Sequence, residues 1–110
     1  MICQHRELTQ GRWAKMPFME QMANIGSEVE RALAWRAKQK ETYCQKSFER
    51  ALELIDLSLE SNAGFSRRKE LARIREFFVD YLFGDNQFQF TDEAWHRYFS
   101  GFFYAARRDR

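Results

Sequence analysis

Residues 17–61 contain two successive runs in which apolar side chains recur at steps of three and four. That spacing stacks side chains on one face of an α-helix. The first run contains Phe18, Met22, Ile25, Val29, Ala32 and Leu33, and the second contains Cys44, Phe48, Ala51, Leu52, Ile55 and Leu59. Because only residues 38–41 separate the runs, the pattern predicts an antiparallel helical hairpin with one shared apolar face.

A third helix is predicted over residues 67–83. It follows a break at 61–65, where Gly64 suits a left-handed backbone conformation and Ser66 can cap the helix that follows. The side chains expected to face inward are Leu71, Ile74, Phe78, Tyr81 and Leu82.

A fourth helix is predicted after a loop at 84–90. Thr91 stands where it can cap the helix, and the loop residues Phe88 and Phe90 are expected to fold back over the end of the bundle. The expected inward stripe consists of Trp95, Phe99, Phe102 and Ala106. No segment shows the alternating pattern of a strand. The sequence therefore predicts an all-α protein, an antiparallel up-down four-helix bundle over residues 16–110. An irregular N-terminal segment, residues 1–15, precedes it, with Trp13 held against the bundle.

Gly26 interrupts the first helix of the hairpin. A glycine inside a helix costs about 1 kcal/mol relative to alanine, so its presence calls for a compensating reason. We expect a neighbouring helix or a bulky ring to approach the backbone closely at this position.

Charge and cysteine content narrow the class of protein. The net charge of +2 argues against a dedicated nucleic-acid-binding protein, in which a basic excess would be general. Cys3 and Cys44 form no disulfide framework or metal-ligand spacing, and Cys44 is expected to be buried and reduced. The N-terminus resembles no signal peptide, and no apolar stretch approaches the roughly 20 residues that cross a bilayer. A cytoplasmic protein is predicted.

Four residues are candidates for chemistry. Glu93 and His96 form half of the motif by which helical bundles bind two metal ions, but the second half is missing, since the other histidine, His5, precedes the bundle. Asp56 and Asp80 border apolar stripes, where carboxylates can act as acids or bases but more often pair with an arginine. We therefore predict no metal, no cofactor and no enzyme activity.

The aromatic share of 16% is high for a small helical core. Several rings stand outside the predicted inward stripes, and such a second apolar face favours self-association as a homodimer. Burial of these rings within a compact bundle explains them equally well. The predicted interface residues are Trp35, Phe77, Phe83, Tyr98 and Phe103.

Two groups of cations are candidates for binding phosphates, such as those of RNA, if they converge in space. Cations at the start of a helix oppose its dipole, so the first group is not a device for stability. The competing interpretation is a solvated face balanced by Glu70, Glu76 and Asp109. The residues concerned are Arg67, Arg68, Lys69, Arg73, Arg107 and Arg108.

The sequence resembles a group of short, uncharacterised helical proteins of bacteria and archaea, which implies no activity. The matching stretches are QMANIGSEV at 21–29, FERALELIDL at 48–57, RKEL at 68–71, DYLFGDN at 80–86 and AARR at 105–108. In its predicted architecture the chain also resembles HEPN domains, four-helix modules that cut RNA or accompany small nucleotidyltransferases. Their nucleases carry an arginine four to six residues before a histidine on a late helix, and no arginine stands at those distances before His96.

These observations predict a non-catalytic helical interaction module that self-associates through its aromatic residues. The alternative is a HEPN-like protein that associates with RNA or a nucleotidyltransferase through the arginine-rich residues named above.

Overall fold

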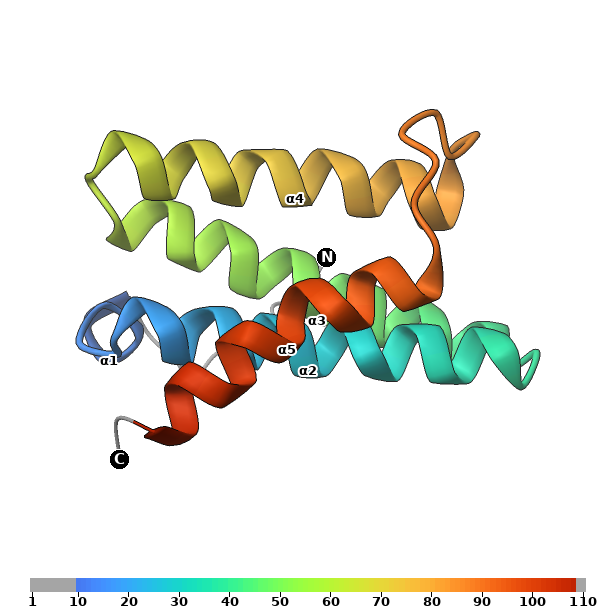
Figure 1. The fold of residues 1–110 in the computed structure, drawn as a ribbon, viewed down its shortest axis with the longest axis horizontal. Coiled ribbons are helices and arrows are strands. Elements are labelled where there is room, and N and C mark those ends of the chain that lie inside the picture. The colour runs from blue at the N-terminus through green and yellow to red at the C-terminus, as the bar shows by residue number, and fades with distance from the viewer. Residues whose placement is uncertain (1–9, 109–110) are drawn as a thin grey trace.

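The computed structural model of the protein describes residues 10–108, which form five helices and no strand (Figure 1). The helices are α1 (Gln10–Ala14), α2 (Phe18–Ala37), α3 (Glu41–Ser61), α4 (Phe65–Phe83) and α5 (Asp92–Arg108). The four long helices pack together, which confirms the predicted all-α bundle. Within residues 10–108, no helix has the length and apolar character needed to cross a membrane.

The hairpin of α2 and α3 is the centre of the molecule. The helices that pack closely are α2 with α3, α2 with α5, α3 with α4, and the short α1 with α3. The predicted apolar faces form the core, in which Ile25 and Ile55 are almost completely buried. Figure 1 shows α5 running obliquely across α2 while α4 lies beside α3. The hairpin therefore carries α4 on one of its helices and α5 on the other.

Part of the segment expected to be irregular is helical, because residues 10–14 form α1. Trp13 in this helix is fully buried, which confirms the predicted contact of Trp13 with the bundle. Its indole Nε1 donates a hydrogen bond to Ser58 Oγ at 2.9 Å, and its carbonyl accepts one from Gln21 Nε2 at 3.0 Å. These tertiary contacts hold a turn of helix that local sequence does not predict. Residues 1–9, including Cys3 and His5, lie outside the described part of the chain.

The beginning of α4 differs from the prediction. The helix starts at Phe65, two residues early, so Ser66 lies inside its first turn and does not cap it. Gly64 takes the N-cap position with φ −71°, an ordinary value and not a left-handed one. The side chain of Arg68 donates to the carbonyls of Leu59 and Asn62 at the end of α3. This contact satisfies carbonyls that a helix end leaves without partners.

The predictions for the second half of the chain are confirmed at the loop and at the start of α5. Thr91 Oγ1 accepts the backbone N–H of Ala94 at 3.0 Å, as an N-cap does. Phe88 and Phe90 fold back, and their ring centroids lie 4.1 and 5.2 Å from that of Phe77. The loop therefore closes over the end of α4.

Candidate functional site: the groove between α4 and α5

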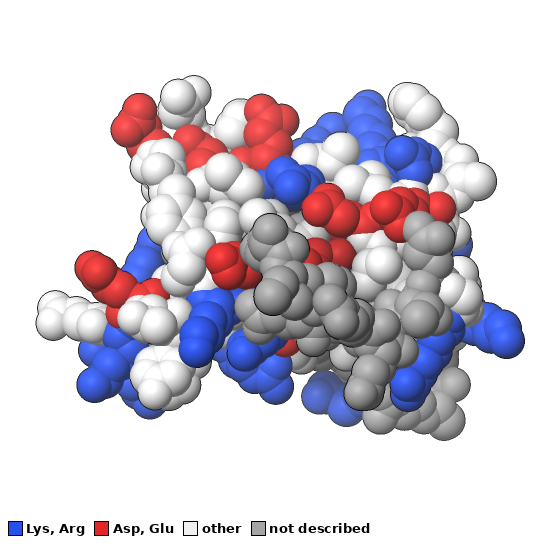
Figure 2. Space-filling view, turned by 180° about the vertical axis from the view of Figure 1, so that it is seen from behind, with Lys and Arg blue, Asp and Glu red and all other residues white. Residues whose placement is uncertain are grey.

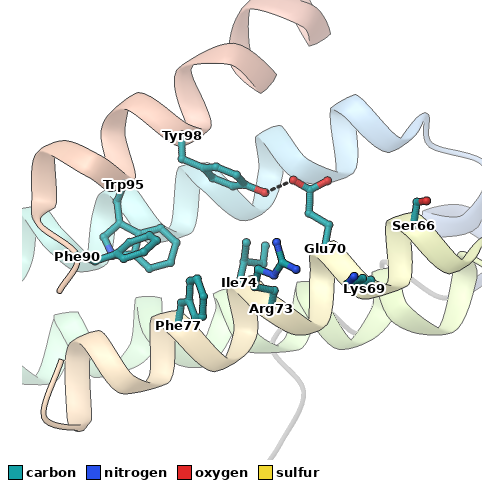
Figure 3. A pocket seen from close by; sticks show the side chains of 9 residues that line it. All are labelled: Ser66, Lys69, Glu70, Arg73, Ile74, Phe77, Phe90, Trp95 and Tyr98. Atoms are coloured by element: carbon teal, nitrogen blue, oxygen red, sulfur yellow. Dashed lines mark hydrogen bonds between the residues drawn. The ribbon is translucent and has the colours of Figure 1, made fainter. Parts of the chain in front are cut away.

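A groove of about 340 Å³ lies between α4 and α5. It exists because α4 packs on α3 and α5 packs on α2, so the two helices face each other without close backbone packing. In Figure 3, side chains of both helices point into the space between them. Its volume falls within the range of small-ligand sites. The lining residues are Ser66, Lys69, Glu70, Arg73, Ile74, Phe77, Phe90, Trp95 and Tyr98.

One end of the groove is aromatic (Figure 3). Trp95 is fully buried, and its ring centroid lies 4.7 Å from that of Phe90, which in turn contacts Phe77. Among the described residues, the Trp95 indole nitrogen has no hydrogen-bond partner. A buried N–H without a partner is uncommon in folded proteins. This end is therefore lined by aromatic rings, and the Trp95 N–H lies buried among them.

The other end of the groove is charged. Tyr98 on α5 donates its hydroxyl proton to Glu70 Oε2 on α4 at 2.6 Å, a bond that bridges the groove (Figure 3). Burial raises the pKa of Tyr98 well above its ordinary value, and the hydrogen bond to Glu70 raises it further; the nearby Arg73 opposes both effects. Tyr98 is therefore a protonated donor at neutral pH, and one oxygen of Glu70 is already engaged.

A second link joins α4 and α5 beyond the aromatic end. Asp92 at the start of α5 accepts the hydroxyl of Tyr81 and forms an ion pair with Arg36 Nη2 on α2 at 3.0 Å. The Arg36 guanidinium also lies 4.6 Å from the Tyr81 ring centroid. Burial, followed by the bond to Asp92, raises the pKa of Tyr81. The two bridges, from Tyr81 and Tyr98, set the spacing of α4 and α5 along the groove.

The predicted interface residues do not form one surface. Phe77 and Tyr98 line the groove. Trp35 stacks on Tyr43 near the turn between α2 and α3, with a centroid separation of 4.8 Å. Phe83 is 57% exposed at the end of α4, and Phe103 is half-buried close to the backbone of α2. The structure therefore assigns these aromatic residues to separate places.

Sequence reasoning missed five of the nine residues that line the groove. Ser66 is predicted only to cap a helix, and Ile74 only to enter the core. Phe90 is predicted only to cover the bundle end, Trp95 only to enter the core, and Glu70 only to balance nearby cations. Nothing in the helical periodicity indicates that α4 and α5 stand apart, because periodicity reports which face of a helix is buried and not which partner covers it.

Of the predicted anion-binding residues on α4, two contact other helices of the bundle and two line the groove. Arg67 lies over the ring of Phe18, 4.9 Å from its centroid, and Arg68 caps α3. Lys69 and Arg73 line the groove. Seen from behind, Figure 2 shows basic side chains gathered at the upper right, over the beginning of α4, with acidic side chains close beside them.

The second predicted group, Arg107 and Arg108, lies at the end of α5. Figure 1 places this helix end and the beginning of α4 at the same end of the molecule. Arg108 lies 6.0 Å from the ring centroid of Tyr104. Neither Arg107 nor Arg108 lines the groove.

The candidate acids, bases and metal ligands have structural partners. Asp56 pairs with Arg75 Nε at 2.9 Å, which confirms the predicted ion pair. Asp80 has no arginine partner among the described residues; its carboxylate lies 3.5 Å from the backbone nitrogen of Phe88 instead. His96 contacts Glu30 on α2. Within residues 10–108, no cluster of three potential metal ligands occurs.

A larger hollow of about 970 Å³ lies beside the turn between α2 and α3. Its wall includes Cys44, which is buried as predicted. Burial raises the pKa of the Cys44 thiol. A raised thiol pKa lowers the share of thiolate, which makes Cys44 a weaker nucleophile than a free cysteine.

Comparisons with protein families, with curated proteins and with solved structures find no match to this chain.

Proposed function

We propose that this chain is a non-catalytic interaction module that binds a ligand in the groove between α4 and α5. One observation carries the proposal. Because α4 and α5 pack on different helices, they stand apart and are joined by side-chain hydrogen bonds, and the rings of Phe77, Phe90 and Trp95 line the space between them. Concave sites with apolar walls and a few placed polar groups are where proteins bind ligands.

Aromatic fragments titrated into the protein should shift the indole N–H resonance of Trp95 in two-dimensional NMR spectra. Trp13 and Trp35 lie outside the groove, so their indole resonances serve as internal controls. Phe90→Ala removes one wall of the aromatic end, and we expect it to weaken fragment binding about three- to tenfold, the value of one lost aromatic contact.

Phe88→Ala is the matched control for this experiment. Phe88 belongs to the same loop and also contacts Phe77, but it does not line the groove. It should leave fragment affinity unchanged. Fragments that move the Trp35 resonance and not that of Trp95, or equal effects of the two substitutions, would contradict the proposal.

Self-association is a second candidate function, and the exposure of Phe83 favours it. This ring is 57% exposed at the end of α4 and contacts the chain through Phe48, with centroids 4.6 Å apart. If Phe83 anchors a homodimer, Phe83→Ser should weaken dimerisation at least about tenfold in sedimentation equilibrium. Tyr104→Ser, which removes a ring that is 61% exposed on α5, is the control. A monomer at every concentration would remove this candidate.

An association with RNA would use the same groove differently. Single-stranded nucleic acids bind where cations adjoin aromatic side chains on which bases stack. Lys69 and Arg73 adjoin Phe77 and Tyr98 in this way. If RNA is the ligand, oligonucleotide binding should depend steeply on salt concentration.

A further inference from the structure

The two ends of the groove differ in chemistry, and the difference limits which ligand fits. Figure 3 shows the rings of Phe77, Phe90 and Trp95 at one end and the charged residues of α4 at the other. A wholly apolar ligand would leave the charged end without a partner. An ion without an apolar part would not use the rings. The complementary ligand therefore carries both features.

The sign of the ligand's charge follows from which cations are already engaged. On α4, Arg67 lies over Phe18, Arg68 caps α3, and Arg75 pairs with Asp56. Within residues 10–108, Arg73 forms no hydrogen bond or ion pair, and the contact of Lys69 is with the ring of Phe65, 5.9 Å away. Both side chains are exposed. The unengaged charges on the groove are therefore positive.

Glu70 does not cancel these charges. One of its oxygens accepts the hydroxyl of Tyr98, and its single negative charge faces two positive ones among the lining residues. The charged end thus keeps a net positive charge. A carboxylate, sulfonate or phosphate group bound there gains charge-assisted hydrogen bonds from Arg73, whose guanidinium suits such groups better than an ammonium does.

We propose that the groove binds a small aromatic acid, with its planar ring against Phe77 and Phe90, beside the buried Trp95, and its anionic group on Arg73 and Lys69. This inference rests on the proposed function, since it names the ligand class for the same groove. The volume of about 340 Å³ suits a ligand of a few rings and not a folded partner.

A pair of fluorescent probes tests the inference. Anilinonaphthalene sulfonate is an aromatic acid, and phenylnaphthylamine has the same rings without the sulfonate. The protein should bind the sulfonate at least about tenfold more tightly, because a hydrogen bond to a charged group has this effect on affinity. Arg73→Gln should weaken sulfonate binding about tenfold and leave the affinity for the uncharged probe unchanged.

Arg75→Gln is the matched control. It removes one positive charge from the same helix, so the change in net charge is identical, but Arg75 pairs with Asp56 and does not line the groove. It should affect neither probe. An equal effect of Arg73→Gln and Arg75→Gln on sulfonate binding would overturn the inference.

The readouts separate failure of this inference from failure of the proposed function. If neither probe shifts the Trp95 indole resonance, the groove is not a binding site and both proposals fail. If both probes shift it but Arg73→Gln does not distinguish them, the groove remains a binding site and the acidic ligand is wrong. A single-stranded oligonucleotide that binds far more tightly than a mononucleotide, with steep salt dependence, would replace the small acid by RNA.

Discussion

Replacing Trp13 by alanine should lower the free energy of unfolding by about 3–5 kcal/mol, the usual effect of removing a fully buried tryptophan. Trp13 has no exposed surface, although it lies in a helix of only five residues. The substitution leaves a cavity against α3 and removes the indole bond to Ser58. Because small domains are stable by only about 5–15 kcal/mol, urea denaturation should show a large shift in midpoint.

Two further substitutions provide comparisons for the loss of stability in Trp13→Ala. Ser58→Ala keeps the ring but leaves its N–H without an acceptor, and should cost about 1–3 kcal/mol. Trp35→Ala removes a half-buried tryptophan that stacks on Tyr43, and should cost less than Trp13→Ala. If Trp13→Ala has no larger effect than Trp35→Ala, then α1 is not an integral part of the fold.

Gly26→Ala should destabilise the protein, although alanine is the better helix former by about 1 kcal/mol. A Cβ atom at this position would lie 2.6 Å from Phe99 Cδ1 and 2.9 Å from Phe103 Cζ. Phe99 is fully buried, so its ring cannot move aside without displacing α5 from α2. Overpacking of this kind costs about 1–3 kcal/mol, which outweighs the gain in helix propensity. The predicted reason for a mid-helix glycine, close approach of a ring, is thus confirmed.

Gly101→Ala is the matched control for Gly26→Ala. Gly101 also lies inside a helix, but a Cβ atom there would have no neighbour within 4 Å. The substitution should therefore stabilise the protein by up to about 1 kcal/mol. Thermal unfolding followed by circular dichroism measures both variants. A gain in stability from both substitutions would show that Phe99 does not press on α2.

The groove is more difficult to predict from sequence than the helices that form it. The Tyr98–Glu70 bridge joins residues 28 positions apart, and the Tyr81–Asp92 bridge spans a loop. No local pattern indicates such pairs, because both depend on how far apart α4 and α5 stand. That spacing follows from their packing on different helices of the hairpin. The cations of α4 are likewise divided by contacts outside their own helix, since Arg67 lies over Phe18 and Arg68 meets the end of α3, whereas Arg73 does neither.

By itself, the sequence determined the helical class of this protein, the extent of α2, α3 and α5, and the apolar faces that enter the core. It could do so because helical periodicity, capping and chain breaks are local properties, readable within a few residues. Tertiary structure decided that residues 10–14 become helical, that Gly26 admits Phe99, and that α4 and α5 enclose a groove. These features depend on contacts between residues distant in the chain, such as that of Trp13 with Ser58, which exist only once the helices have packed.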